Sequence, residues 1–133
     1  MFQPGDYADT LRALGRFLDD AGASEIAIVD EGDWWSVSWQ RGGTRRLQFY
    51  QLDALRTVAR LHRGREGDLP RLTTSQMLRT LGSRIDDAHA TQFTIQELPD
   101  GFRVAGLIDG QQWEQTLSLD DLRASLQESL EAR

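Results

Sequence analysis

The sequence predicts an α+β fold built by tandem duplication of an αβββα module, with antiparallel three-stranded meanders and helices packed around a pseudo-twofold axis. Three observations predict it: the chain matches itself at a shift of 67 positions, both halves show the same order of helical and strand periodicity, and both place turn residues at equivalent points. A length of 133 residues suits one compact domain. We expect repeat one at 6–63, a linker at 64–72 and repeat two at 73–130.

The internal match needs no gap. Of the 46 positions from 11 to 56, 17 carry the same residue as the position 67 further along the chain, where about three identities would be expected by chance. The identities cluster, for example 11–15 against 78–82 and 52–56 against 119–123. We therefore interpret the chain as the product of a gene duplication.

Each half opens with a predicted helix. Asp6 with Asp9, and Thr73 with Gln76, have the spacing of a capping box at a helix start. Apolar residues then recur at helical spacing, and a stretch of small residues ends the pattern. The apolar stripes consist of Tyr7, Leu11, Leu14, Leu18 and Ala21 in the first half, and of Leu78, Leu81, Ile85 and Ala88 in the second.

Three strands are expected next in each half. Alternating apolar residues indicate the first two strands, and turn residues separate them. A second turn follows, and its Asp109-Gly110 dipeptide in the second half is typical of a hairpin. The third strand is expected at about 45–50 and 112–117. The alternating residues are Ile26, Ile28, Trp35, Val37 and Trp39 in the first half, and Phe93, Ile95, Phe102 and Val104 in the second.

The third strand breaks the correspondence between the halves. We expect Leu47 and Phe49 on the apolar, core-directed face of this strand in the first half, and Trp113 and Leu117 on that face in the second half. The latter two align with Arg46 and Tyr50. A slip of one residue moves every side chain of a strand to the opposite face. Either one copy of the strand is bulged, or the two faces have different partners. The pattern also leaves open whether the six strands form one sheet or two.

A second helix is expected from Leu52 and from Leu119, where Ser118 and Asp121 have capping-box spacing. One copy alone has three short strands and cannot cover its own core, so the two copies should share one core, as a homodimer would. The predicted core consists of Leu11, Leu14, Leu18, Ile26, Ile28, Trp35, Val37 and Leu55, together with Leu78, Leu81, Ile85, Ile95, Val104 and Leu122.

The composition excludes several chemistries. Cysteine is absent, so there are no disulfides, thiol nucleophiles or cysteine zinc sites. All 15 basic residues are arginine, which excludes lysine Schiff bases and the usual phosphate-loop lysine. We attribute this usage to a GC-rich genome and expect a bacterial source. The longest apolar run covers only 26–29. We therefore expect no signal peptide, no membrane partner and a cytoplasmic location.

The candidate catalytic groups have simpler interpretations. Asp19-Asp20 and Asp86-Asp87 stand near the predicted end of a helix, where adjacent residues do not face each other, and we interpret them as solvated or turn-forming. His62 and His89 lack the further ligands that a metal needs. No nucleophile motif or phosphate-binding loop occurs. We therefore predict no catalytic residue, metal or cofactor, and a protein that is not an enzyme.

Arginines form a run after the third strand of the first half. Arg56, Arg60 and Arg63 have the spacing of a single helix face, with Arg65 and Arg71 beyond them. Such a run could hold phosphate or an acidic partner. Because charge runs on helices are more often solvated, we interpret this one as a solvated face.

Positions at which the halves differ are free to specialise, and the sharpest differences fall on the second and third strands. Strand alternation is expected to place Trp34, Arg46, Gln48 and Tyr50 on the outer face of the first sheet, flanked by Arg41 and Arg45. Aromatic and arginine side chains are enriched in binding hot spots. The predicted binding residues are therefore Trp34, Arg41, Arg45, Arg46, Gln48 and Tyr50. The alternative is that this face packs against the second repeat or a second subunit.

These observations predict a non-catalytic protein-interaction or scaffold module. Its partner is expected to be another protein or a second copy of the chain, because the net charge of −6 disfavours nucleic acid. Two alternatives stay open. One is nucleic-acid binding through the arginine and aromatic sheet face of repeat one, and the other is binding of a small ligand between the repeats.

Overall fold

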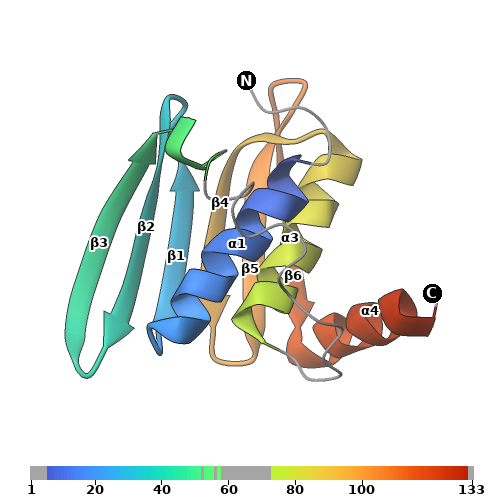
Figure 1. Cartoon of the computed structure of the whole chain (residues 1–133). Helices are drawn as coiled ribbons and strands as arrows, with labels where there is room; N and C mark the ends of the chain where they lie inside the picture. The colour runs from blue at the N-terminus through green and yellow to red at the C-terminus, as the bar shows by residue number, and fades with distance from the viewer. Residues whose placement is uncertain (1–5, 52, 56, 58–72, 132–133) are drawn as a thin grey trace.

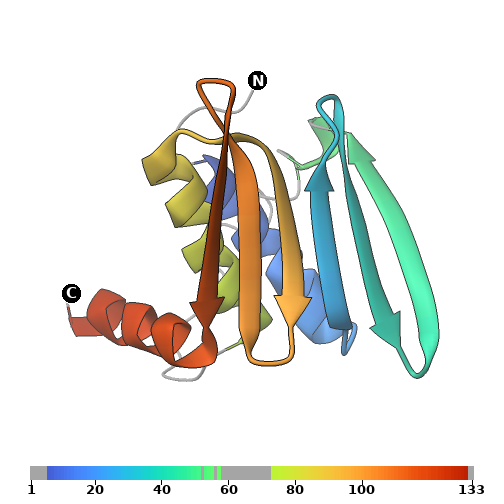
Figure 2. The same ribbon diagram turned by 180° about the vertical axis from the view of Figure 1, so that it is seen from behind.

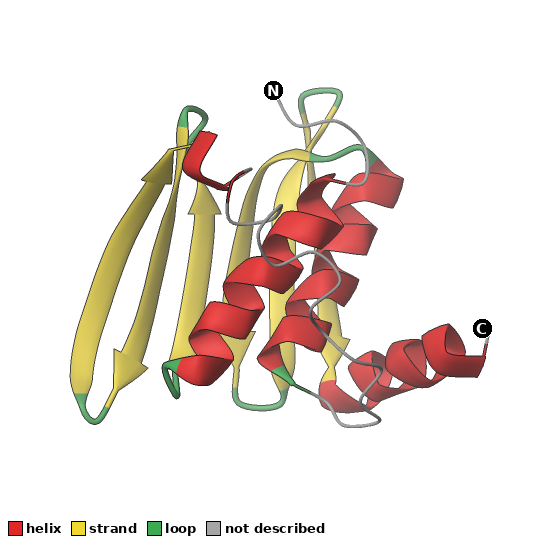
Figure 3. Ribbon diagram, viewed as in Figure 1, coloured by secondary structure: helices red, strands yellow, loops and turns green. Residues whose placement is uncertain are grey.

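The computed structural model of the chain describes residues 6–51, 53–55, 57 and 73–131 (Figure 1). The fold is α+β, and helices lie on one face of a six-stranded antiparallel sheet (Figures 1 and 3). The elements are α1 (Asp6–Asp20), β1 (Ser24–Asp30), β2 (Trp34–Arg41), β3 (Thr44–Gln51), α3 (Thr74–Ala88), β4 (Thr91–Leu98), β5 (Gly101–Ile108), β6 (Gln111–Ser118) and α4 (Leu119–Glu131).

The strands form a single sheet with the order β3-β2-β1-β4-β5-β6, which answers the question that the sequence left open. At its centre, β1 pairs antiparallel with β4, and Ile28 lies opposite Ile95. These two residues are 67 positions apart, the same shift at which the sequence matches itself. Each half thus contributes a three-stranded meander, and the two first strands meet in the middle.

Tight turns connect the outer strands of each meander. Gly42 and Gly43 have φ angles of 57° and 81°, and Asp109 and Gly110 have φ angles of 52° and 80°. Two successive positive φ angles define a type I′ turn, whose twist matches that of the flanking strands. The predicted hairpin at Asp109-Gly110 is therefore confirmed, and Gly42-Gly43 forms its counterpart.

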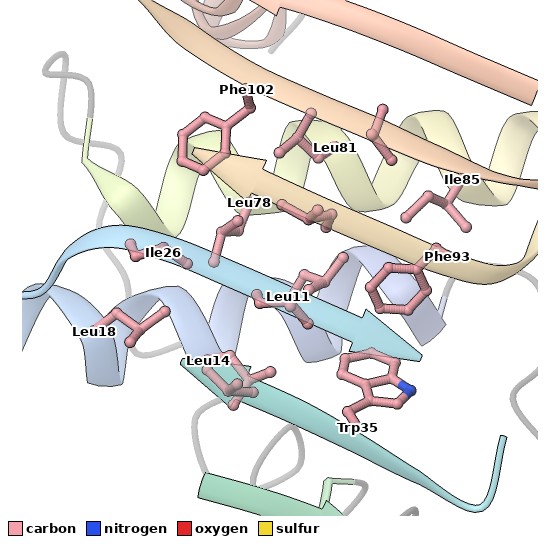
Figure 4. Close-up of a cluster of buried hydrophobic side chains, with 14 of the residues drawn as sticks. Leu11, Leu14, Leu18, Ile26, Trp35, Leu78, Leu81, Ile85, Phe93 and Phe102 are labelled. Carbon is pink, nitrogen blue, oxygen red and sulfur yellow. The ribbon is translucent and has the colours of Figure 1, made fainter. Parts of the chain in front are cut away.

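The core lies between the sheet and the pair of helices α1 and α3 (Figure 4). All the residues that the sequence predicts to be in the core are buried there. Trp35, which is 0% exposed, packs edge-on against Phe93 with ring centroids 4.8 Å apart and stacks parallel to Tyr7 at 6.1 Å. Side chains from both halves therefore fill one continuous core.

Two glycines allow α1 and α3 to pack backbone against backbone. A Cβ atom on Gly15 would lie 2.5 Å from the Cα of Ser75, and one on Gly82 would lie 2.7 Å from the Cα of Ala8. Both distances are shorter than non-bonded carbon atoms tolerate. Only glycine therefore permits this close helix contact without a shift of the backbone.

The acidic pairs at the helix ends do more than the sequence indicates. The carboxylate of Asp19 accepts hydrogen bonds from the backbone N–H groups of Thr74 and Ser75 at 2.9 and 3.0 Å, and Asp86 accepts one from Ala8 at 3.1 Å. Each half-buried carboxylate thus caps the first turn of the other helix, where unpaired N–H groups and the helix dipole favour negative charge. Our interpretation of Asp19 and Asp86 as solvated or turn-forming is wrong, whereas Asp20 and Asp87 are exposed, as that interpretation predicts.

The third strands are not bulged. β3 pairs with β2, and β6 with β5, without a register shift; Trp35 lies opposite Tyr50, and Phe102 opposite Leu117. The irregularities instead fall at the starts of β1 and β4. The two halves therefore share one register, in which Leu47 and Phe49 point away from the helices. Their expected place on the core face is wrong, because the apolar residues of β3 lie on a face that no described helix covers.

Some predictions fall outside the described residues. These are the linker at 64–72, His62, and the arginine run at Arg56, Arg60, Arg63, Arg65 and Arg71. Of the second helix expected in repeat one, 53–55 and 57 are helical, and Leu55 is buried.

Candidate functional site

One face of the sheet carries no helix in the described part of the chain, and we call it the open face (Figure 2). In an antiparallel sheet, residues opposite each other point to the same side. Since Trp35, Val37 and Trp39 point into the core, their neighbours along β2 point to the open face. On β2 and β3 these open-face residues are Trp34, Ser36, Ser38 and Gln40, opposite Gln51, Phe49, Leu47 and Arg45.

Large apolar side chains gather on the part of the open face formed by the first half. Trp34, Leu47 and Phe49 are 43%, 60% and 62% exposed. In the adjoining strand β1, half-buried Ala27 and Val29 lie opposite Ser38 and Ser36, on the same face. We call Ala27, Val29, Trp34, Leu47 and Phe49 the apolar patch. Single exposed apolar residues are common on protein surfaces, whereas a group of them on one face indicates a binding surface.

The second half carries no such group at the matching positions of the open face. At a shift of 67 positions the five patch residues correspond to Thr94, Gln96, Gly101, Glu114 and Thr116. Glu114 forms an ion pair with Arg103 at 3.6 Å across β5 and β6. The two halves therefore share a core but differ in the chemistry of the open face.

The predicted binding residues do not share one face. Trp34 lies on the open face, but Arg46, Gln48 and Tyr50 lie opposite Trp39, Val37 and Trp35 and therefore point to the helix side. The expected common face is wrong, because that expectation took the apolar residues of β3 for core residues. Tyr50 packs against the core, and its burial raises the pKa of the phenol.

The two remaining predicted residues flank the hairpin turn. Arg45 donates hydrogen bonds to the backbone carbonyl of Glu25 at 2.9 Å and to Oγ of Ser38 at 2.8 Å, and it approaches the carboxylate of Glu25 at 4.0 Å. Arg41, at the end of β2, lies opposite Thr44. The structure thus divides the arginines, since Arg45 is held on the open face whereas Arg41 and Arg46 are exposed on the helix side.

Leu47 and Phe49 are functional candidates that the sequence argument missed. The internal match contained a signal for them. Because Trp113 and Leu117 align with Arg46 and Tyr50, a shared register places Leu47 and Phe49 on the opposite face. Treating the two registers as identical would have identified the patch.

A hollow of about 570 Å³ lies at the seam between β1 and β4. It is open to solvent, and its lining includes Glu25, Arg45 and Glu97. The carboxylate of Glu97 accepts a hydrogen bond from the N–H of Ile26 at 3.1 Å, which bridges the two strands where their pairing ends. At the other end of the seam, Asp30 accepts backbone hydrogen bonds from Gln92 and Phe93. These carboxylates are therefore structural bridges.

The described residues offer few groups for catalysis. Asp19 and Asp86 serve as helix caps. His89 ends α3 in a left-handed conformation with φ 55° and is exposed. Within 6–51, 53–55, 57 and 73–131, no three histidine, aspartate or glutamate side chains are grouped so that they could hold a metal ion.

Comparison of the chain with protein families, with characterised proteins and with solved structures finds no match. In the part of the chain that the structure describes, no helix is long and apolar enough to span a bilayer.

Proposed function

We propose that the chain is a non-catalytic protein-interaction module whose partner binds the apolar patch on the open face. One observation carries the proposal: each patch residue has a polar residue or glycine at the matching position of the second half. A requirement of the fold would apply to both halves. Because Leu47 and Phe49 are about 60% exposed, their apolar character is better explained by a bound partner than by packing within the chain.

We also infer that the chain arose by duplication of an αβββα unit, with the halves related by a pseudo-twofold axis between β1 and β4. Equivalent residues make reciprocal contacts in three places, which supports the inference. Ile28 lies opposite Ile95, Gly15 and Gly82 contact the starts of the opposite helices, and Asp19 and Asp86 cap those starts. Duplication explains how one half could keep the core while its outer face specialised.

The geometry favours a protein over a nucleic acid as the partner. A nucleic-acid surface combines stacking aromatic rings with a continuous basic groove. Here Trp34 and Phe49 share the open face with Arg45, which is already bonded to Glu25 and Ser38. The exposed arginines Arg41 and Arg46 lie on the other side of the sheet. The hollow at the seam is open and partly acidic, which gives a small apolar ligand little enclosure.

The test is a double variant, Leu47→Glu with Phe49→Thr, which introduces the residues that the second half carries at the matching positions. Tagged wild-type and variant chains are used to capture proteins from the native cell lysate, and any protein lost from the variant is identified by mass spectrometry and titrated against the purified chains. We expect the variant to bind this partner at least about tenfold more weakly. Glu114→Ala with Thr116→Ala, at the matching positions of the second half on β6, is the matched control and should bind normally.

Sedimentation equilibrium of the same variants tests whether the partner is a second copy of the chain. A wild-type dimer that the double variant abolishes would assign the patch to self-association. The proposal fails if every captured protein and the oligomeric state are unchanged in the folded double variant.

A further inference from the structure

The strand β3 is an edge of the sheet, because it pairs with β2 and with no other strand in the described part of the chain. The geometry of the preceding turn determines which backbone groups of β3 do not bond to β2. In a two-residue type I′ hairpin the flanking residues Arg41 and Thr44 form a hydrogen-bonded pair, and such pairs alternate along the strands. The N–H and C=O groups directed to the empty edge are therefore those of Arg45, Leu47, Phe49 and Gln51.

These outward backbone groups belong to the residues whose side chains lie on the open face. A further strand laid along this edge would place every second side chain beside Leu47 and Phe49 on the open face. Its intervening side chains would lie on the helix side beside Arg46 and Gln48. Both Arg46 and Gln48 are exposed.

The charge of this hairpin contrasts with the rest of the chain. Residues 34–51 contain three arginines and no aspartate or glutamate, although the whole chain has a net charge of −6. The matching hairpin of the second half, 101–118, contains one arginine and two acidic residues. Among the described residues, Arg41 and Arg46 make no ion pair. Arg46 on β3 and Arg41 at the end of β2 therefore present positive charge on the helix side of this edge, and the apolar patch lies on its open face.

We propose that β3 binds an extended acidic segment of a partner protein as a seventh strand, with apolar side chains of the segment on the open face and acidic ones on the helix side. The inference rests on the proposed function and specifies its partner. Backbone hydrogen bonds supply affinity in this mode, and alternate side chains supply specificity. A second copy of the chain is disfavoured as the occupant, because β3-to-β3 pairing would bring two arginine-rich, acid-free hairpins together.

The probe is an eight-residue capped peptide of alternating valine and glutamate, matched to the eight residues of β3. A peptide of alternating valine and lysine is the charge control. Calorimetric titration should show that the Val–Glu peptide binds the full chain at least about tenfold more tightly than the Val–Lys peptide. The difference should shrink as salt is raised, because charge attraction is screened. Equal binding of both peptides, or binding of neither, overturns the proposal.

Backbone methylation of the peptide tests strand pairing without changing the protein. In an antiparallel arrangement the valines lie opposite Leu47 and Phe49, so their N–H groups face β3, whereas the glutamate N–H groups point away. Methylation of the valine nitrogens should abolish binding, whereas methylation of the glutamate nitrogens should leave the binding of the peptide unchanged. The reverse result would overturn the antiparallel register, and no effect of either methylation would overturn strand addition.

A matched pair of protein variants provides the second measurement. Leu47→Ala and Leu47→Pro both remove the leucine side chain, but only Leu47→Pro removes the outward N–H group. Proline is tolerated on an edge strand when its nitrogen faces outward, and circular dichroism establishes that both variants fold. We expect Leu47→Pro to bind the Val–Glu peptide at least about tenfold more weakly than Leu47→Ala. Equal binding by the two folded variants contradicts the inference.

The two proposals can fail separately. A lysate partner that depends on Leu47 and Phe49, combined with a Val–Glu peptide that does not bind, would leave the interaction module intact and refute strand addition. Peptide binding at β3 without any patch-dependent partner would instead refute the proposed function.

Discussion

The carboxylate of Asp19 and the backbone N–H of Ser75 are 3.0 Å apart, although the two residues belong to different halves of the chain. Asp86 makes the matching bond to Ala8. At α3 the capping is completed by Thr73, whose hydroxyl accepts a hydrogen bond from the N–H of Gln76 at 3.2 Å. The helix pair is therefore joined by charge at both ends and by glycine contacts along its length.

The first prediction concerns this cap. Asp19→Ala should lower the free energy of unfolding by about 1–2 kcal/mol, because it leaves two N–H groups of the first turn of α3 without an acceptor. Asp20→Ala is the matched control. Asp20 is exposed and makes only an ion pair with Arg16 at 3.6 Å, so its loss should cost less than about 0.5 kcal/mol. Urea unfolding measures both, and equal losses would contradict the role assigned to Asp19.

The second prediction concerns the contact of α1 with α3. Gly15→Ala and Gly82→Ala should each destabilise the protein by about 1–3 kcal/mol, although alanine is the better helix former. The added methyl group meets backbone atoms of the opposite helix, and these cannot move aside by a side-chain rotation. Arg16→Ala, on an exposed position of α1, should change the stability by less than about 0.5 kcal/mol. A neutral or stabilising Gly15→Ala would show that the helices are further apart.

The third prediction concerns pH. Burial raises the pKa of Asp30 above its usual value of 3.8, against hydrogen bonds from Gly32, Gln92 and Phe93 that lower it. The folded state therefore holds this proton more tightly than the unfolded state. The bound proton therefore stabilises the folded state. This stabilisation is fully present below pH 3.8 and is lost as the pH rises through the raised pKa of Asp30. Asp30→Asn removes this dependence, so the stability of the variant relative to wild type should rise from about pH 3 to pH 6. A difference in unfolding free energy between Asp30→Asn and wild type that stays constant across that range would contradict the raised pKa of Asp30.

The fourth prediction concerns the start of α4. Asp121 accepts a hydrogen bond from the N–H of Ser118 at 3.0 Å, and the hydroxyl of Ser118 accepts one from Asp121 at 3.1 Å. The bonds from the backbone and side chain of Ser118 lower the pKa of Asp121 below 3.8. Ser118→Ala should raise this pKa part of the way back, since the backbone N–H remains. The contribution of this cap to the stability of the folded state is present above pH 3.8 and is lost as the pH falls through the lowered pKa of Asp121. Carbon-detected NMR titration measures the shift, and an unchanged pKa would refute the side-chain contribution.

The core was predictable from the sequence because inward residues obey a simple period. Leu14 and Leu81 lie in the core as their helical stripes predict, and Trp35 and Val104 do so as strand alternation predicts. The capping box at Ser118 was predictable because its chemistry is local. These features depend on neighbours a few residues away along the chain.

The binding surface was harder to predict because it depends on what lies beside β3. An apolar period of two shows that one face of a strand is apolar, but not which face of the sheet a helix covers. Leu47 and Phe49 therefore looked like core residues. The caps made by Asp19 and Asp86 were missed for a related reason, since each carboxylate contacts the helix of the other half, which no local spacing indicates.

The central position of β1 and β4 determines how the molecule can open. Ile28 and Ile95 lie where the two halves join, with strands on both sides. Separating the halves would break the pairing of β1 with β4 and the contact of α1 with α3 at the same time. The amide protons bonded between β1 and β4 should therefore exchange with solvent only when the whole protein unfolds. The outward N–H groups of Leu47 and Phe49 are protected by no strand in the described part of the chain, and they should exchange without any unfolding. The molecule thus joins a slowly exchanging centre to a rapidly exchanging margin at β3, where a partner strand could add without disturbing the rest.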